Sequence, residues 1–298
     1  TEGSRLKTKG WLIDIQNFSV NDGDGIRTVV FFAGCRLRCQ WCCNPESFTN
    51  FNKVVHDARS CIACGRCVEV CPYGVGINLN DPMERLKCTN CGICVEACPT
   101  HSRKNMIMVI EAQEVIKRIE RQMLFFRASN GGVTYSGGEA TAQPNFLRAL
   151  TNAVYDLGLH QAIETSGYFN YEQVADIFAK IDLVFVDIKL FDDGEHQRYT
   201  GMSNELILQN IKRLSDAGKD MVIRIPVIKG VNATPETISN IARFTADTLR
   251  SPKLELLPYH KFGSQKYESL GLPQPPGEFA TPTAEEMTLL TDLVRREG

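Results

Sequence analysis

The chain contains the stretch Phe32-Ala-Gly-Cys35-Arg-Leu-Arg-Cys39-Gln-Trp-Cys42, in which three cysteines follow at C-x3-C-x2-C spacing. Three thiolates are one fewer than a four-iron cluster needs for saturation. A cube bound by four cysteines only transfers electrons, whereas a cube bound by three leaves one iron open to an outside ligand. Zinc is the alternative, but zinc loops usually carry two C-x2-C pairs. The spacing therefore indicates an iron-sulfur cluster at which chemistry occurs.

Around this stretch the composition is that of a globular enzyme. The 298 residues are 43% apolar, enough for one large barrel or two domains. A net charge of −2 and a pI near 6.2 argue against nucleic acid or a membrane surface as an electrostatic partner. No apolar run approaches the roughly 18 residues of a membrane span, and no secretory signal is apparent. We therefore expect a cytoplasmic protein without a nucleic-acid or membrane partner.

The twelve cysteines lie between Cys35 and Cys98, and the chain after Cys98 contains none. Disulfides would be spread more widely, whereas ligands of one inorganic cluster must converge from short spacers. Two segments repeat each other, Cys61-Ile-Ala-Cys64-Gly-Arg-Cys67-Val-Glu-Val-Cys71-Pro72 and Cys88-Thr-Asn-Cys91-Gly-Ile-Cys94-Val-Glu-Ala-Cys98-Pro99. This duplication resembles a bacterial two-cluster ferredoxin, in which the fourth cysteine of each repeat binds the other cluster. The resemblance implies one cluster on Cys61, Cys64, Cys67 and Cys98, and another on Cys88, Cys91, Cys94 and Cys71.

Short apolar runs alternate with segments of helical spacing in the rest of the chain, which predicts a parallel sheet. The expected strands are 28–32, 132–135, 161–163, 183–186, 221–225 and 254–257, and the expected helices are 111–126, 145–157, 171–180, 204–217 and 234–249. Six strand-helix units are fewer than the eight of a closed barrel. The predicted fold class is α/β: a partial (β/α)6 TIM-like barrel of residues 1–48 and 105–298, with an inserted ferredoxin-like domain at 49–104.

Polar residues follow the expected strands at their carboxyl ends, where ligands bind in parallel sheets. They are Ser136-Gly137-Gly138-Glu139, Glu164-Thr165-Ser166, Asp187-Ile-Lys189, Arg224, and Tyr259-His260. Two glycines let a ligand approach the backbone closely, although an ordinary turn would also use them. Asp187 and Lys189 share a strand face, as ligand contacts or as a buried ion pair. Arg224 in an apolar run needs an anionic partner, and His260 is either a ligand contact or a core histidine.

At this point the chain resembles the radical S-adenosylmethionine enzymes, because an aromatic residue precedes the third cysteine and six βα units are expected. The upstream run Asp22-Gly-Asp24-Gly-Ile-Arg27, with Asn44-Pro-Glu46 and Leu257-Pro-Tyr-His260, is similar to the activating enzymes of glycyl radical enzymes over essentially the whole chain. The resemblance implies a catalytic cluster on Cys35, Cys39 and Cys42. We expect Cys43 to be a packing residue, because adjacent cysteines rarely both reach one cube. It implies cofactor contacts by Trp41, Gly137, Gly138, Glu139, Glu164, Ser166, Asp187, Lys189, Arg224 and His260.

The same resemblance implies the reaction. S-adenosylmethionine bound at the open iron would yield a 5′-deoxyadenosyl radical, which removes an α-hydrogen from a glycine of a large partner enzyme. It also implies three 4Fe-4S clusters in all, an external donor such as flavodoxin or ferredoxin, a monomeric chain, and a monovalent cation near Glu164, Thr165 and Asp187. Asp22 and Arg27 would help to seat the glycine loop.

Two departures from the family pattern concern Asp24, where proline is usual, and Glu164, where aspartate is commoner. The insert favours activators of dehydratases, decarboxylases, or carbon-sulfur and carbon-nitrogen lyases, and the chain does not say which partner it serves. A radical enzyme acting on a small molecule or another peptide is one alternative. A non-catalytic iron-sulfur electron carrier is the other.

Overall fold

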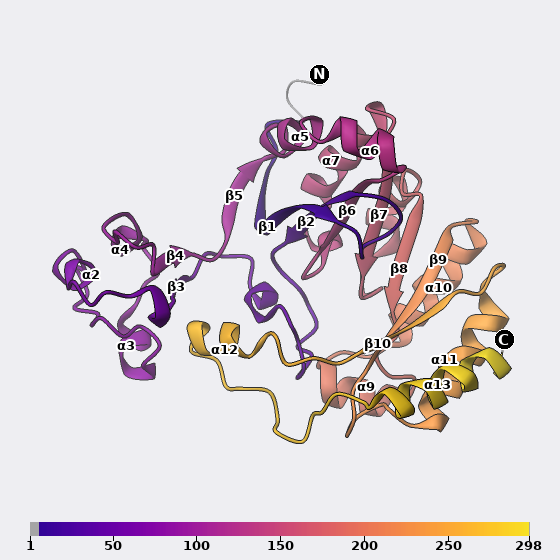
Figure 1. Cartoon of the computed structure of the whole chain (residues 1–298). Helices are drawn as coiled ribbons and strands as arrows, with labels where there is room; N and C mark the ends of the chain where they lie inside the picture. Colours follow the sequence, from indigo (N-terminus) through magenta and orange to yellow (C-terminus); the bar gives the residue numbers. More distant parts are fainter. Residues whose placement is uncertain (1–5, 298) are drawn as a thin grey trace.

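The structure, a computed structural model, describes residues 6–297. An eight-stranded sheet forms its main body, with the strand order β10-β9-β8-β7-β6-β2-β1-β5 (Figure 1). Its strands are β1 (Lys9–Ser19), β2 (Arg27–Phe32), β5 (Met108–Glu111), β6 (Gly132–Gly137), β7 (His160–Thr165), β8 (Leu183–Asp187), β9 (Asp220–Val227) and β10 (Leu254–Pro258). The six strands from β2 to β10 pair in parallel, whereas β1 is antiparallel to both β2 and β5. The sheet is thus mostly parallel and has two outer strands, β10 and β5.

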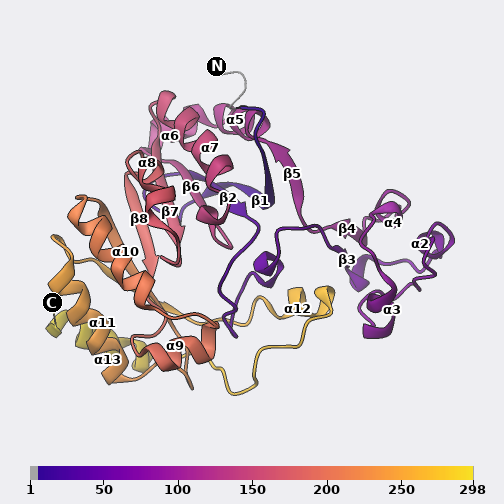
Figure 2. The same cartoon turned by 180° about the vertical axis from the view of Figure 1, so that it is seen from behind.

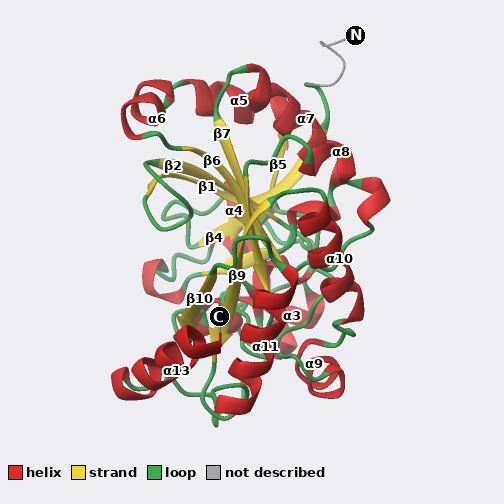
Figure 3. Ribbon diagram, turned by 90° about the vertical axis from the view of Figure 1, so that its right-hand side faces the viewer, coloured by secondary structure: helices red, strands yellow, loops and turns green. Residues whose placement is uncertain are grey.

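Helices cover the outer face of this twisted sheet (Figures 2 and 3). They are α5 (Ala112–Glu120), α6 (Met123–Ser129), α7 (Pro144–Asp156), α8 (Ala175–Phe178), α9 (Asp193–Thr200), α10 (Glu205–Asp216), α11 (Pro235–Thr248) and α13 (Ala284–Glu297). A further helix, α12 (Ser264–Leu270), lies apart from the sheet, as Figure 1 shows. The central strands β6 and β9 are buried along almost their whole length, as is usual for parallel strands. None of the helices within residues 6–297 has the length and apolar character to cross a membrane.

The predicted strands correspond to β2 and β6 to β10, so the α/β prediction and the six parallel strands are confirmed. Other details differ. The expected helix 111–126 is two helices, α5 and α6, because Arg121 and Gln122 interrupt it. The segment 171–180 forms a 3-10 turn, η4 (Tyr171–Gln173), and the single-turn helix α8. The antiparallel strands β1 and β5 and the helices α9, α12 and α13 were not predicted.

The segment from β3 to β4, residues 54–105, projects from the main body as a separate lobe, seen at the left of Figure 1. We call this segment the cysteine lobe. It contains a two-stranded sheet of β3 (Val54–His56) and β4 (Arg103–Asn105), the short helices α2 (Arg66–Glu69), α3 (Pro82–Lys87) and α4 (Ile93–Glu96), and the 3-10 turn η2 (Ala58–Ser60). Gly65 and Gly92 precede α2 and α4 at equivalent places of the two repeats, and both have left-handed backbone conformations. The sequence duplication is therefore also a structural one.

Candidate active site

The three-cysteine loop leaves the carboxyl end of β2 and packs into an apolar cluster. Cys39 is buried there with Trp41, and Cys35 and Cys42 are half-buried at its edge. Leu37, Leu190, Ile228, Tyr259 and Phe279 complete the cluster. All three thiols are free, and the backbone N–H of Asn44 donates to Cys42 Sγ over 3.4 Å. Three free thiols on one short loop fit three irons of a four-iron cube, since its thiolate ligands are free cysteines.

Burial controls the protonation of these thiols. It raises the pKa of Cys35 to about 12 and also raises the pKa values of Cys39 and Cys42. A thiol in apolar surroundings is neutral at pH 7, whereas a metal ligand must be a thiolate. Binding of iron to this loop must therefore release protons.

The turn after β6 requires both of its glycines. Gly137 has φ +106, and a Cβ on it would lie 2.4 Å from the backbone nitrogen of Phe32. A Cβ on Gly138 would lie 2.5 Å from the carbonyl oxygen of Gly34. The N–H of Gly138 donates to the Phe32 carbonyl at 2.8 Å, and that of Glu139 donates to Gly34 at 2.8 Å. The turn thus lies directly against the start of the three-cysteine loop, closer than a residue with a Cβ atom would allow.

Glu139 joins the ends of β6 and β7. Its carboxylate is 2% exposed and accepts hydrogen bonds from the hydroxyls of Thr141, Thr165 and Ser166, at 2.7 to 2.9 Å. The backbone N–H of Ser166 donates to the same carboxylate at 2.9 Å. A buried carboxylate with this many donors is strongly held, because charged acceptors form the stronger hydrogen bonds. Glu139 and Ser166, both predicted site residues, are therefore parts of one network beside Cys35.

Asp187 and Lys189 form an ion pair at the end of β8, with 2.6 Å between Asp187 Oδ2 and Lys189 Nζ. Burial alone would lower the pKa of Lys189, but Asp187 and the nearby Cys39 and Cys35 raise it above its usual value. The lysine therefore stays charged beside the three-cysteine loop. It is suited to stabilise negative charge on a bound cluster or ligand.

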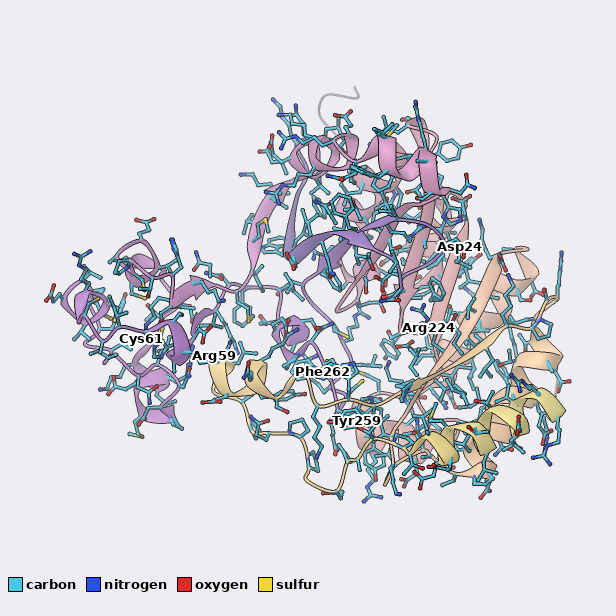
Figure 4. All side chains as sticks on the ribbon, viewed as in Figure 1. Asp24, Arg59, Cys61, Arg224, Tyr259 and Phe262 are labelled. Atoms are coloured by element: carbon cyan, nitrogen blue, oxygen red, sulfur yellow. The ribbon has the colours of Figure 1, made fainter. Side chains whose placement is uncertain are left out.

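Arg224 lies in the sheet interior between two carboxylates. Its Nη1 is 2.5 Å from Glu164 Oε1 and its Nε is 2.8 Å from Glu255 Oε2. The guanidinium also lies over the Phe185 ring, 3.6 Å from its centroid, and Ser136 Oγ donates to Glu164 at 2.5 Å. Although burial would lower its pKa, the two carboxylates raise the pKa of Arg224. Arg224, which is labelled in Figure 4, thus has the anionic partners that its burial demands, and both belong to the chain itself.

Two other predicted contacts lie at the rim or in the core. His260 is exposed, stacks on Phe262 with 4.4 Å between ring centroids, and places Nδ1 3.9 Å from Cys43 Sγ. Trp41 is 6% exposed and packs against Tyr199 and Phe279. The structure therefore gives Trp41 a packing role, and it leaves His260 accessible at the mouth of the site. Contacts of either residue with a cofactor stay predictions.

Arg27 does not lie where a protein partner could reach it. It is fully buried, and its guanidinium donates to Thr134 Oγ1 at 2.7 Å and to the carbonyls of Asp24 and Val133 at 3.0 and 2.8 Å. The interpretation that Arg27 seats a glycine loop is therefore wrong, because its donors hold the β1–β2 turn onto β6. Asp22 is only half-buried, and its role stays a prediction.

The cysteine lobe contains two cavities whose walls divide its cysteines. One cavity is lined by Cys61, Cys64, Cys67 and Cys98. The other is lined by Cys71, Cys88, Cys91 and Cys94, and Cys67 also reaches it. Backbone N–H groups of Ala63, Asn90 and Arg103 donate to Sγ of Cys61, Cys88 and Cys98 at 3.4 to 3.5 Å. Within residues 6–297, no three His, Cys, Asp or Glu side chains already surround one metal-ion position.

Sequence reasoning missed the residues that hold this site from outside the strand ends. Glu255 could have been found, because its place in β10 pairs with Arg224 in the parallel register. No sequence signal points to α12, where Tyr267 donates its hydroxyl to the Cys42 carbonyl at 2.9 Å. Lys266 of the same helix lies 2.8 Å from Asn44 Oδ1 and 2.5 Å from Glu46 Oε1. Glu46 is in the 3-10 turn η1 (Pro45–Phe48) that follows the cysteines, so α12 clamps the end of the three-cysteine loop.

Comparison with known proteins agrees with this geometry. The Radical SAM superfamily matches residues 29–244, a range that includes the three-cysteine loop, the glycine turn and the strands up to β9. A solved radical SAM methyltransferase from Sphaerobacter thermophilus has the same fold, with a TM-score of 0.53 over 96% of this chain and 75% of that chain, at 12% identity. The fold and the site therefore define a member of the radical SAM superfamily.

Curated relatives narrow the class. The isethionate sulfite-lyase activating enzyme of Nitratidesulfovibrio vulgaris is 38% identical over 97% of this chain and 96% of its own length. The trans-4-hydroxy-L-proline dehydratase activating enzyme of Clostridioides difficile is 39% identical over 93% of each chain. The chain belongs to the family of glycyl radical enzyme activating enzymes.

Proposed function

We propose that this chain activates a glycyl radical enzyme by using S-adenosylmethionine to generate a radical on one of its glycines. One observation carries the proposal: three free thiols, one fewer than a cube requires, lie against a turn where both glycines are sterically required. The other eight cysteines of the sequence repeats line two separate cavities. The open coordination position at Cys35, Cys39 and Cys42 is thereby left for an outside ligand.

When bound, the reduced cluster would supply one electron to the sulfonium of S-adenosylmethionine, and a carbon-sulfur bond would break to give methionine and a 5′-deoxyadenosyl radical. This radical would take an α-hydrogen from the partner's glycine. The protein holds and shields these groups. The apolar cluster around Cys39 and Trp41 excludes water from the thiolates. Lys189 would offset their negative charge, and the backbone at Gly137 and Gly138 would accept a ligand at close range.

The remaining predicted cofactor contacts surround this turn. Glu139 and Ser166 are held in the shared network, so they would present a fixed surface to the ligand. Asp187 and Arg224 already have partners of opposite charge. If Arg224 binds the cofactor's carboxylate, it must exchange Glu164 or Glu255 for that group. Glu164 and His260 complete the proposed set.

We assign the two cavities of the cysteine lobe to two further 4Fe-4S clusters, for three in all. Their linings support the ligand sets implied by the ferredoxin resemblance, Cys61, Cys64, Cys67 and Cys98, and Cys88, Cys91, Cys94 and Cys71. We place the domain boundaries at 48/49, between η1 and β3, and at 104/105, within β4. The electrons would come from an external donor such as flavodoxin or ferredoxin. The protein would act as a monomer in the cytoplasm.

The residues expected around a monovalent cation fit one poorly. Glu164 is paired with Arg224 at 2.5 Å and Asp187 with Lys189 at 2.6 Å. The Thr165 hydroxyl donates to Glu139. A further cation would have to share carboxylates that are already neutralised, so we do not assign one a role in the reaction.

The partner belongs to the class that the insert favours, since relatives of this chain activate a sulfite-lyase, a dehydratase, a decarboxylase and a trimethylamine-lyase. The test uses the anaerobically reconstituted, reduced chain with S-adenosylmethionine and each of the corresponding four enzymes, plus indoleacetate decarboxylase. We expect 5′-deoxyadenosine, and a persistent glycyl radical in the electron spin resonance spectrum of one enzyme. Formation of 5′-deoxyadenosine without a radical on any of them would contradict the activase assignment. Absence of 5′-deoxyadenosine would contradict the radical chemistry itself.

A further inference from the structure

A cleft of about 430 Å³ lies between the cysteine lobe, α12 and the main body. The lobe contributes β3, η2 and β4 to its walls, and η1 and β1 contribute Glu46 and Ile13. Helix α12 contributes Gln265, Lys266, Glu268, Ser269 and Leu270. Figure 1 shows α12 beside the lobe, and Figure 4 shows Arg59 of η2 on the side nearest this helix. None of the cofactor contacts described above lines this cleft.

Buried polar atoms at the cleft lack partners. Within residues 6–297, Glu46 Oε2, Asn80 Oδ1 and both ring nitrogens of His56 have no hydrogen-bond partner. Glu46 is only 6% exposed, and an orphaned buried oxygen costs free energy until a donor reaches it. His56 also lines the cavity of Cys61, so we assign only Glu46 and Asn80 to a ligand in the cleft. Both orphaned oxygens accept hydrogen bonds, and their ligand must therefore donate them.

The charges of the cleft balance one another. Asp57 pairs with Arg59 at 3.1 Å, and Glu46 Oε1 pairs with Lys266 at 2.5 Å. The apolar side chains of Ile13, Val55, Met106 and Leu270 share the lining with these pairs. A strongly anionic or cationic ligand would find no net field here. Backbone amides with mixed side chains, as in a peptide segment, match this lining.

We propose that the cleft binds an extended segment of the glycyl radical enzyme, whose backbone N–H groups donate to Glu46 and Asn80. This proposal rests on the proposed function, which supplies a protein partner. It is supported by the two-stranded sheet of β3 and β4 at the cleft, because each of these strands has one edge without a strand partner among the described strands. An extended segment aligns with such an edge.

The cleft communicates with the three-cysteine loop through few atoms. Lys266 contacts Glu46 inside the cleft and also bonds Asn44 Oδ1 at 2.8 Å. Asn44 in turn donates its backbone N–H to Cys42 Sγ. Three hydrogen bonds therefore connect Glu46, on which the segment would be seated, with the third cluster ligand, Cys42. Docking of the partner in the cleft and placement of its glycine at the cluster are thereby linked.

The test blocks the cleft without touching the cofactor site. Ala58 is exposed and lines the cleft, so Ala58→Trp fills part of it. We expect the KM for the activated partner to rise about tenfold or more, as for loss of about 1.4 kcal/mol of binding. Formation of 5′-deoxyadenosine without partner should stay within about twofold of wild type, which is about 0.4 kcal/mol. Leu86→Trp is the matched control, because Leu86 is 80% exposed on the same lobe and does not line the cleft.

Asn80→Leu is the second variant. Removal of an orphaned buried acceptor should leave the melting temperature unchanged or raise it, whereas loss of a buried structural hydrogen bond would lower it. We expect the KM for the partner to rise at least threefold, about 0.7 kcal/mol. An unchanged KM in both variants would overturn the cleft proposal while leaving the activase assignment intact. A dimer of the chain that Ala58→Trp dissociates would also overturn it, because a second copy would then occupy the cleft. If the wild type activates no partner, the proposed function fails and this proposal fails with it.

Discussion

The main body and the cysteine lobe surround their cysteines differently. Around the three-cysteine loop, Cys39 and Trp41 belong to an apolar cluster of seven buried residues, next to the large core of the sheet. In the lobe the buried apolar cluster contains only Val54, Val75 and Leu79, and Cys64 and Cys91 are exposed. A core of three residues cannot stabilise a lobe of this size. We therefore infer that iron stabilises the folded lobe, whereas the main body folds without iron and binds it only for catalysis.

Iron removal tests this contrast most directly, with the largest expected effect. Chelation should unfold the lobe, because metal binding there supplies the folding free energy, while the sheet stays folded on its apolar core. Hydrogen exchange followed by mass spectrometry should show loss of protection in residues 54–105 and retained protection in β6 to β9. Equal protection of both regions in the iron-free protein would show that iron is not needed to keep the lobe folded.

Cys39→Ala tests the main body, where we expect iron to serve catalysis and not folding. The variant should lose cleavage of S-adenosylmethionine by at least about 10³-fold, because the catalytic cube loses a ligand. It should keep roughly eight irons per chain in the lobe, by the stoichiometry of two cubes, and it should stay folded. Iron analysis and 5′-deoxyadenosine assays measure both. Cys43→Ala is the control, and a similar loss there would show that the third ligand is wrongly assigned.

Glu139→Gln probes the polar network of the main body. Replacement of the buried carboxylate by an amide weakens the hydrogen bonds from Thr165 and Ser166 and leaves donors facing donors. We expect the free energy of unfolding to fall by about 2–3 kcal/mol, with loss of cofactor cleavage, as measured by urea unfolding and product assays. Glu114→Gln, at an exposed position of α5, should change stability by less than about 0.5 kcal/mol. A stability loss in Glu139→Gln no larger than in this control would show that the network is not structural.

The smallest expected effect lies at the far end of the main body. Arg243 and Ser239 of α11 donate to Glu297 of α13, and they lower the pKa of Glu297 to about 2, from an ordinary value of 4.5. A depressed carboxyl pKa adds stability above pH 4.5 that is lost as the pH falls toward 2. The difference in unfolding free energy between wild type and Glu297→Gln should therefore shrink below pH 4.5. If this difference in unfolding free energy does not change with pH, the Arg243–Glu297 pair does not stabilise the packing of α13 on α11.

Much of the sheet was predictable because buried parallel strands are continuous apolar runs between helical periods. The strands β1 and β5 were missed, since their partly exposed faces mix polar and apolar residues. The residues at the strand ends were predictable for the same topological reason, because carboxyl ends of parallel strands meet at one edge. Glu139 and Ser166 do come together there.

Other features depend on contacts that no local pattern encodes. The clamp by α12 joins residues 225 positions apart, and Tyr267 lies in a short helix with no distinguishing periodicity. Arg27 was misinterpreted because the family resemblance suggests a role at the partner's glycine loop, whereas the structure buries Arg27 in the sheet with hydrogen bonds to Thr134 and Val133. Burial of a charge, and the partner that makes it tolerable, become visible only in three dimensions.

The clamp by α12 also sets an order of events during synthesis. Cys42 leaves the ribosome 225 residues before Tyr267, the residue that holds its carbonyl. At 5–20 residues per second this separation corresponds to roughly 10 to 45 seconds. Throughout that interval the loop has its thiols but not its final shape. A cluster delivered early would meet an unfinished site, so maturation of the catalytic iron belongs after translation has ended.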